Sequence, residues 1–133
     1  MFMALQMIRF NDSQLEICTA GMPPVLIYRH KKKAVEEILI KAVPLGISLN
    51  FEFKSVKIKV ESGDCIILMS DGLPERFNEN KEMFGYERSK SVLYEKQNFS
   101  AQEIIDHLIK VGNHWAGKAI QNDDITFIVI KII

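Results

Sequence analysis

The segment Cys65–Met69 contains only apolar residues, and it constrains the fold of this chain more than any other feature. Turn-forming residues at Glu61–Asp64 lead the chain into it. A strand that lacks a polar face is normally covered on both faces by other parts of the protein. We therefore predict that residues 65–69 form a central strand with further layers of structure on each side.

Other apolar runs predict additional strands, most of them antiparallel. These runs cover residues 2–10, 14–19, 25–28, 35–40 and 51–60. The first two runs should form one hairpin around a turn at 11–13, and the next two a second hairpin around a basic loop at 29–33. In the last run, valine and isoleucine alternate with lysine, which is typical of a strand with one solvated face.

Helical signals appear only in the last third of the chain. Residues 87–97 predict one helix, and Ser100 begins another. Ser100 and Glu103 have the spacing of a capping box, in which each side chain accepts a hydrogen bond from a free N–H at the helix start. Apolar residues then recur at helical spacing, at Ile104, Ile105, Leu108, Val111 and Trp115. Strands followed by helices predict an α+β fold.

Length, charge and cysteine usage bound the class of protein. The 133 residues suffice for one domain, which we assign to 1–133. Basic and acidic residues both number 17, and this balance indicates neither a nucleic-acid partner nor an anionic membrane. No apolar stretch approaches the length of a membrane span. Cys18 and Cys65 lie inside strand-like runs without disulfide or metal spacing, so we expect buried thiols in a reducing cytoplasm.

Two acidic segments flank apolar runs that are far apart in the chain. Ser70-Asp71-Gly72-Leu73 follows the run 65–69, and Asn122-Asp123-Asp124-Ile125-Thr126 opens the run 127–130. If these two strands are antiparallel neighbours, the carboxylates of Asp71, Asp123 and Asp124 converge at one end of a sheet. Clustered carboxylates repel one another and usually accompany a cation, and their oxygens suit Mg²⁺, Mn²⁺ or Ca²⁺. Each segment alone also fits an ordinary turn or solvated loop, but the matched pair favours a metal site.

The order of short motifs along the chain resembles one protein family. The motifs are Ala20–Pro24, Pro44–Gly46, Glu61–Asp64, Ser70–Glu75, Glu82–Gly85 and Asn122–Thr126. Their series resembles the metal-dependent protein serine/threonine phosphatases of type 2C, and most closely their bacterial branch that acts in sporulation and in sigma-factor partner switching. The resemblance spans nearly the whole chain.

The resemblance implies a β-sandwich flanked by helices, with two divalent cations, Mn²⁺ or Mg²⁺, at one end of the sheets. It implies that Asp71 and Asp123 are metal ligands, and that Asp124 is either a third ligand or a residue that orients the loop. Gly72 would allow a tight backbone turn beside the ions, and Thr126 would hydrogen-bond locally. No residue of the chain is expected to act as a catalytic nucleophile, because in this family a water molecule attacks phosphoserine or phosphothreonine directly.

One departure from the family pattern limits these expectations. The family's early Gly-Asp-x-x-Gly-His-Gly motif, whose aspartate bridges the two metals, does not occur in the 133 residues. We therefore interpret residues 1–133 as the C-terminal portion of a phosphatase domain. With half the ligands, we expect weak metal binding or a single site, and little activity from this chain alone.

The sequence is compatible with three candidate functions. The first is a fragment of a working phosphatase whose substrate is a phosphorylated regulatory protein, such as an anti-sigma antagonist. The second is a non-catalytic binding module that retains the phosphatase fold. The third, a small two-carboxylate hydrolase or nuclease, has the least support because the chain has no basic groove. We also expect a homo-oligomer, because a partial sandwich should leave apolar faces and a strand edge bare.

Overall fold

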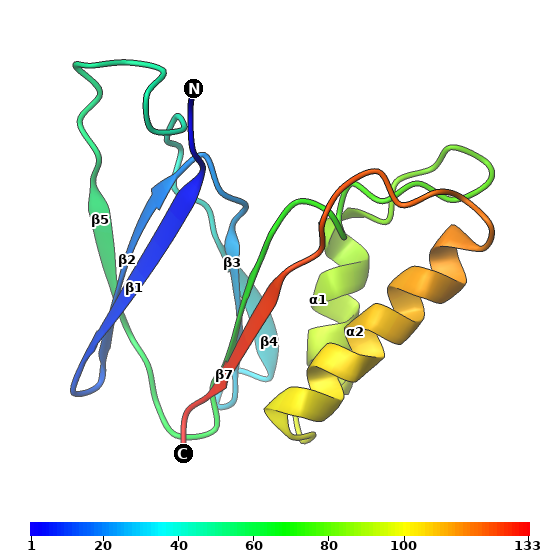
Figure 1. Ribbon diagram of the computed structural model, residues 1–133. Coiled ribbons are helices and arrows are strands. Elements are labelled where there is room, and N and C mark those ends of the chain that lie inside the picture. Colours follow the sequence, from blue (N-terminus) through cyan, green and yellow to red (C-terminus); the bar gives the residue numbers. More distant parts are fainter.

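The computed structural model describes residues 1–133 as two stacked β-sheets with two helices against one of them (Figure 1). The elements are β1 (Leu5–Asn11), β2 (Gln14–Ala20), β3 (Val25–Arg29), β4 (Ala34–Ile38), β5 (Ser55–Lys59), β6 (Cys65–Met69), α1 (Gly85–Glu95), α2 (Ala101–Ala116) and β7 (Phe127–Lys131). The predicted α+β sandwich with helices near the C-terminus is thus confirmed.

The two sheets contain only antiparallel pairs. One sheet has three strands in the order β1-β2-β5, and the other has four strands in the order β4-β3-β6-β7. Both predicted hairpins are present, as β1–β2 and β3–β4. The segment Gly21–Pro24 separates them, because its prolines cannot donate backbone hydrogen bonds to a ladder.

Strand β6 lies between β3 and β7, and all five of its residues are buried. Alternate side chains point to opposite faces of the sheet. Ile66 and Leu68 pack between the two sheets, whereas Cys65, Ile67 and Met69 pack against the helices. The predicted central strand covered on both faces is therefore confirmed.

Each face of the four-stranded sheet has its own hydrophobic core. The core between the sheets contains Leu15, Ile17, Val25, Ile27, Val60, Ile66 and Leu68. The core beneath the helices contains Leu26, Tyr28, Cys65, Ile67, Met69, Leu73, Phe84, Val92, Leu93, Ile104 and Leu108. The second core extends beyond the sheet to Leu73 and Phe84, and so it fixes the loop that follows β6.

The predicted capping box is present at the start of α2. The backbone N–H of Glu103 donates to Ser100 Oγ at 3.3 Å, and the backbone N–H of Ser100 donates to Glu103 Oε2 at 2.8 Å. Helix α1 begins at Gly85, two residues before the predicted start. No helix in the structure is both long enough and apolar enough to cross a membrane.

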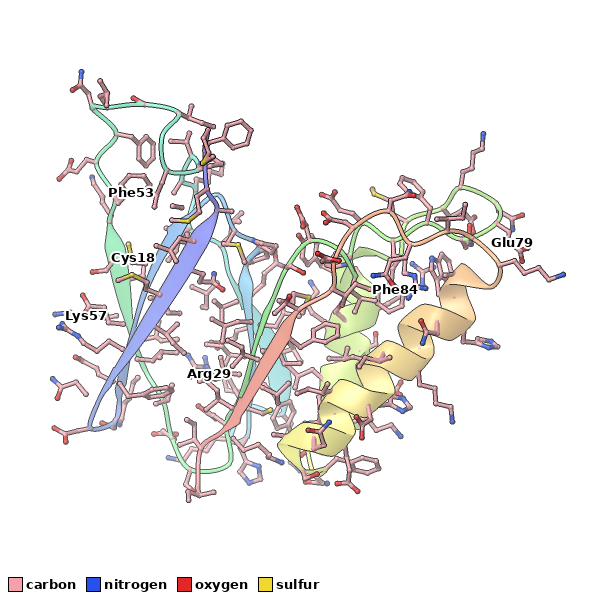
Figure 2. The ribbon with its side chains drawn as sticks, in the orientation of Figure 1. Cys18, Arg29, Phe53, Lys57, Glu79 and Phe84 are labelled. Carbon is pink, nitrogen blue, oxygen red and sulfur yellow. The ribbon has the colours of Figure 1, made fainter.

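Two sequence predictions are wrong in the three-stranded sheet. The strand predicted at 51–60 is shorter, because β5 begins at Ser55, which pairs with Cys18. Residues before Ser55 would have to pair with the end of β2, which stops at Ala20, before Gly21 and two prolines. Cys18 is half-buried rather than buried. Its side chain lies on the outer face of this sheet, which no helix covers, and Lys57 on the same face points away from the second sheet (Figure 2).

Candidate metal-binding end of the four-stranded sheet

Strands β6 and β7 are antiparallel neighbours, as the site prediction required. Met69 at the end of β6 pairs with Phe127 at the start of β7. The segment that begins at Ser70 therefore leaves the sheet where the segment ending at Thr126 enters it. The two acidic segments, whose Asp71 and Asp123 are 52 residues apart in the chain, meet at one end of the four-stranded sheet.

Ser70 joins the two segments by three hydrogen bonds. Its backbone N–H donates to Thr126 O at 3.1 Å, and its Oγ accepts from the backbone N–H of Thr126 at 3.0 Å. Its hydroxyl also donates to Asp124 O at 3.0 Å. The sequence analysis gave Ser70 no role, although a hydroxyl residue between a buried strand and an acidic turn was a usable signal. Through these hydrogen bonds, Ser70 fixes the spacing of the two acidic segments.

Gly72 brings the two backbones into close contact. A Cβ atom at this position would lie 2.2 Å from Asp124 O, closer than non-bonded atoms approach. Gly72 does not have a positive φ angle, whereas Gly21 and Gly46 do. Gly72 lies in the turn at 71–75, and the position requires glycine for the close approach of Asp124 rather than for an unusual φ angle.

The three predicted ligand side chains, Asp71, Asp123 and Asp124, are all exposed. Asp123 Oδ1 accepts a hydrogen bond from the backbone N–H of Asp124 at 2.7 Å. None of the three carboxylates forms a salt bridge with a lysine or arginine. The end of the sheet thus carries oxygen donors whose negative charge is not neutralised by a neighbouring side chain.

Hard carboxylate oxygens of this kind are suitable ligands for Mg²⁺ or Mn²⁺. However, no three side chains of Asp, Glu, His or Cys lie close enough together to hold a metal ion by themselves. The donor set therefore fits part of a coordination shell and falls short of a complete one.

The loop after Asp71 is anchored beneath the helices. Gly85 N–H donates to Pro74 O at 2.8 Å, and Leu73 is buried against α2. Tyr86 lies near this loop, and burial together with the charges of Glu75 and Asp71 raises the pKa of its hydroxyl. Tyr86 therefore presents a neutral phenol beside the acidic end, a feature that the sequence did not reveal.

An apolar groove of about 300 Å³ lies beside the acidic end. It is lined by Ala4, Leu5, Gln6, Met22, Leu68, Met69, Ser70, Thr126 and Ile128. Its walls come from β1 on one side and from β6 and β7 on the other. The groove therefore lies between the two sheets, on the side formed by the edge strands β1 and β7.

Solved structures show the class of protein to which this architecture belongs. The SiaA-PP2C domain of Pseudomonas aeruginosa superimposes with a TM-score of 0.80 at 18% identity, covering 91% of this chain and 47% of that one. The phosphatase domain of SpoIIE from Bacillus subtilis superimposes with a TM-score of 0.73 at 23% identity, covering 98% of this chain and 56% of that one. The fold is that of the PP2C phosphatase domains, of which this chain spans about half.

Sequence comparison narrows the class to a family. The family model of Stage II sporulation protein E (SpoIIE) matches residues 1–133, and the chain belongs to this family. It is 29% identical to the phosphoserine phosphatase RsbU of Bacillus subtilis and 32% identical to Stage II sporulation protein E of Priestia megaterium. These alignments cover 98% and 96% of the chain but 39% and 21% of the relatives. The chain thus spans two fifths or less of these relatives.

Proposed function

We propose that this chain forms one half of the active end of a metal-dependent protein phosphatase that hydrolyses phosphoserine or phosphothreonine. One observation supports this most strongly: Ser70 hydrogen-bonds the Asp71 segment to the Asp123-Asp124 segment, and the carboxylates are left exposed and unpaired. Membership of the SpoIIE family supports the same class of chemistry.

Asp71 and Asp123 are the residues that would hold Mn²⁺ or Mg²⁺, with Asp124 as a third candidate. When bound, such ions lower the pKa of a water molecule and stabilise the charge of phosphoryl transfer. The chain contributes the anionic oxygens, and Ser70 and Gly72 set the distance between the segments that carry them. The serine at this end, Ser70, has its hydroxyl engaged with backbone groups of Asp124 and Thr126, so a water molecule is the proposed attacking group.

The proposed substrate is a phosphorylated regulatory protein, such as an anti-sigma antagonist. Two comparisons support this choice. One relative is named phosphoserine phosphatase RsbU, and one solved structure with a TM-score of 0.68 contains the RsbU and RsbW domains of Rv1364c from Mycobacterium tuberculosis. We also propose that the chain self-associates, through exposed apolar side chains.

A non-catalytic binding module is the second candidate function. Two observations favour it: the structure has no group of three potential ligand side chains, and the Gly-Asp-x-x-Gly-His-Gly motif does not occur in the 133 residues. Under this alternative the sandwich is kept for binding, and the acidic end has no hydrolytic role.

Calorimetry with Mn²⁺ tests the proposed ligands. Wild-type chain should bind Mn²⁺ weakly, and Asp71→Asn or Asp123→Asn should reduce this binding because each removes an anionic oxygen. Asp106→Asn is the matched control, since Asp106 is an exposed aspartate on α2, away from the acidic end. Tight binding at two sites, or equal binding by all variants, would contradict the assignment of Asp71 and Asp123.

Phosphatase assays separate the two candidate functions. The 133-residue chain should hydrolyse p-nitrophenyl phosphate or a phosphoserine peptide hardly at all with excess Mn²⁺, because an error of about 1 Å in the site can cost roughly 100-fold in rate. Joining the chain to a relative's segment that carries the Gly-Asp-x-x-Gly-His-Gly motif should produce Mn²⁺-dependent turnover that Asp123→Ala abolishes. A folded, Mn²⁺-binding fusion without turnover would support the binding module instead.

A further inference from the structure

Residues 76–84 form a short β-hairpin between the turn that contains Asp71 and the start of α1 (Figure 1). Phe77 and Met83 lie opposite each other on its two arms. Backbone hydrogen bonds of 3.0 Å and 2.9 Å flank this pair, and the two residues exchange none with each other. Antiparallel pairs of this type have the closest side chains. Phe77 and Met83 therefore form one apolar pair.

The hairpin is held in one shape by contacts within the chain. Asn78 Oδ1 accepts a hydrogen bond from the backbone N–H of Glu82 at 2.9 Å. Trp115 Nε1 on α2 donates to Glu82 O at 3.3 Å, and Arg88 Nη1 on α1 donates to Phe84 O at 2.6 Å. Both helices thus hold the hairpin, and its position beside the acidic end is set by residues of this chain.

The two faces of the hairpin have different environments. Phe84 is fully buried, and its ring lies edge to face with Trp115, with 6.2 Å between the ring centroids. Figure 2 shows Phe84 beside the helices and Glu79 at the outer end of the hairpin. Side chains alternate along a strand, so Phe77 and Met83 lie on the other face, where they are 40% and 53% exposed. Neither residue belongs to a hydrophobic core, which leaves the pair free to contact another molecule.

The turn before the hairpin sets the distance from Asp71 to this pair. Glu75 N–H donates to Asp71 O at 2.9 Å, and the next N–H donates to Leu73 O at 3.1 Å, so the chain advances here as a helical turn. A rise of about 1.5–2 Å per residue places Phe77 roughly 9–12 Å from Asp71. An extended peptide rises about 3.3 Å per residue, so the distance corresponds to about three residues.

We propose that Phe77 and Met83 dock an apolar side chain of the phosphorylated protein substrate, about three residues from its phosphoserine or phosphothreonine. This inference rests on the proposed function, which places the phosphoryl group beside Asp71. A peptide bound there must cross the neighbouring surface, and the hairpin presents a rigid apolar pair at the distance of the third residue. Covering this pair removes apolar surface from water, so the contact selects a substrate by its sequence as well as by its phosphate.

Methionine-methyl NMR of the 133-residue chain measures this contact directly, even when binding is weak. The probes are peptides with a central phosphoserine in an alanine background, with either leucine or serine three residues before or after it. The Met83 methyl signal should shift at peptide concentrations about 3- to 10-fold lower with leucine than with serine, because covering a half-exposed pair recovers part of the free energy of full burial. Met7, which is 59% exposed on β1, should not respond.

Substitutions of Phe77 test whether the apolar pair causes the preference for leucine. Phe77→Ser should abolish the preference, and Phe77→Leu should retain it. Phe99→Ser is the matched control, because Phe99 is 41% exposed and lies just before α2, at the end of the helix opposite Trp115. The control should keep the preference of wild type. Thermal unfolding followed by circular dichroism checks that each variant is folded.

Kinetics of the fusion with a relative's Gly-Asp-x-x-Gly-His-Gly segment test the contact when the rest of a domain is present. With excess Mn²⁺, kcat/KM should be about 3- to 10-fold higher for the leucine peptide than for the serine peptide. A Met83 signal that responds equally to both peptides or to neither, or equal turnover of the two peptides, would overturn the docking proposal. A selective Met83 response in a folded fusion without turnover would instead contradict the proposed function and leave the docking site standing.

Discussion

Arg29 donates to Asp64 across the end of the sandwich that lies opposite the acidic site, with 3.0 Å between Nη1 and Oδ2. Asp64 is 2% exposed and also accepts from the backbone N–H groups of His30 and Glu61. The same guanidinium donates to Lys59 O at 2.7 Å, at the end of β5. This one pair therefore joins the β3–β4 loop, the turn before β6 and the edge of the other sheet.

The change Asp64→Ala should lower the free energy of unfolding by about 1–3 kcal/mol, because it leaves the backbone N–H groups of His30 and Glu61 without their acceptor. Arg29 would keep its ion pair with Glu36, so its charge would stay compensated. Urea denaturation measures the effect. Arg9→Ala is the control, since it breaks an ion pair in which Arg9 is 75% exposed, and it should change stability by about 1 kcal/mol or less. Equal effects for the two variants would show that the Arg29–Asp64 pair does not hold the sheets together.

Acid should destabilise the protein through carboxylates that are hydrogen-bonded in the folded state. Hydrogen bonds from Lys32 and Arg29 lower the pKa of Glu36, and hydrogen bonds from Ser100 lower the pKa of Glu103. A lowered folded-state pKa adds stability above the pKa of the unfolded chain, which is lost as the pH falls through the folded value.

We therefore expect constant stability above about pH 5 and a decline below about pH 4. Glu36→Gln should make this decline less steep, as measured by urea denaturation at a series of pH values. Glu52→Gln serves as the control, because Glu52 has no hydrogen bond or salt bridge in the structure. An unchanged slope in Glu36→Gln would contradict the role of the Lys32 and Arg29 hydrogen bonds.

Local patterns were sufficient to predict much of the fold. The apolar segment Cys65–Met69 predicted the central strand, and Ser100 with Glu103 predicted the start of α2. Both features depend on residues that are close in sequence, so their physical cause is visible in a short window. The meeting of the two acidic segments at one end of the sheet was also predictable, because it followed from the order and direction of β6 and β7.

Features that depend on contacts between distant segments were not predictable. The role of the Ser70 hydroxyl depends on its hydrogen bonds to Asp124 and Thr126. The need for glycine at position 72 depends on the carbonyl oxygen of Asp124. The exposure of Cys18 depends on which sheet face the helices cover. These contacts join segments that are far apart in sequence, so the spacing of residue types along the chain does not predict them.

The two cysteines should differ in reactivity. Burial raises the pKa of the Cys65 thiol to about 11, so this cysteine should not react with a thiol reagent at pH 8 in the folded protein. Cys18 is half-buried on the uncovered sheet face and should react. Mass spectrometry after brief labelling should find one modified cysteine in the folded chain and two in urea. Labelling of Cys65 in the folded chain would show that the core around β6 opens readily.

The contact between Gly72 and Asp124 leads to a prediction that links stability to metal binding. Gly72→Ala would place a Cβ 2.2 Å from Asp124 O, and backbone rather than a flexible side chain would have to move. We expect a loss of about 1–3 kcal/mol in the free energy of unfolding. We also expect weaker Mn²⁺ binding, because the segments that carry Asp71 and Asp123 would be pushed apart.

Gly63→Ala is the matched control for this change. Gly63 lies in the turn before β6, at the end of the sandwich opposite the acidic segments, and a Cβ there would lie 2.7 Å from Cγ of His30. Gly63 also has a φ of +90°, which alanine adopts with strain, so the control should lose stability as well. Calorimetry should show Mn²⁺ binding close to wild type for Gly63→Ala and reduced binding for Gly72→Ala. If both variants bound Mn²⁺ like wild type, the spacing of the two acidic segments would have no part in holding the metal.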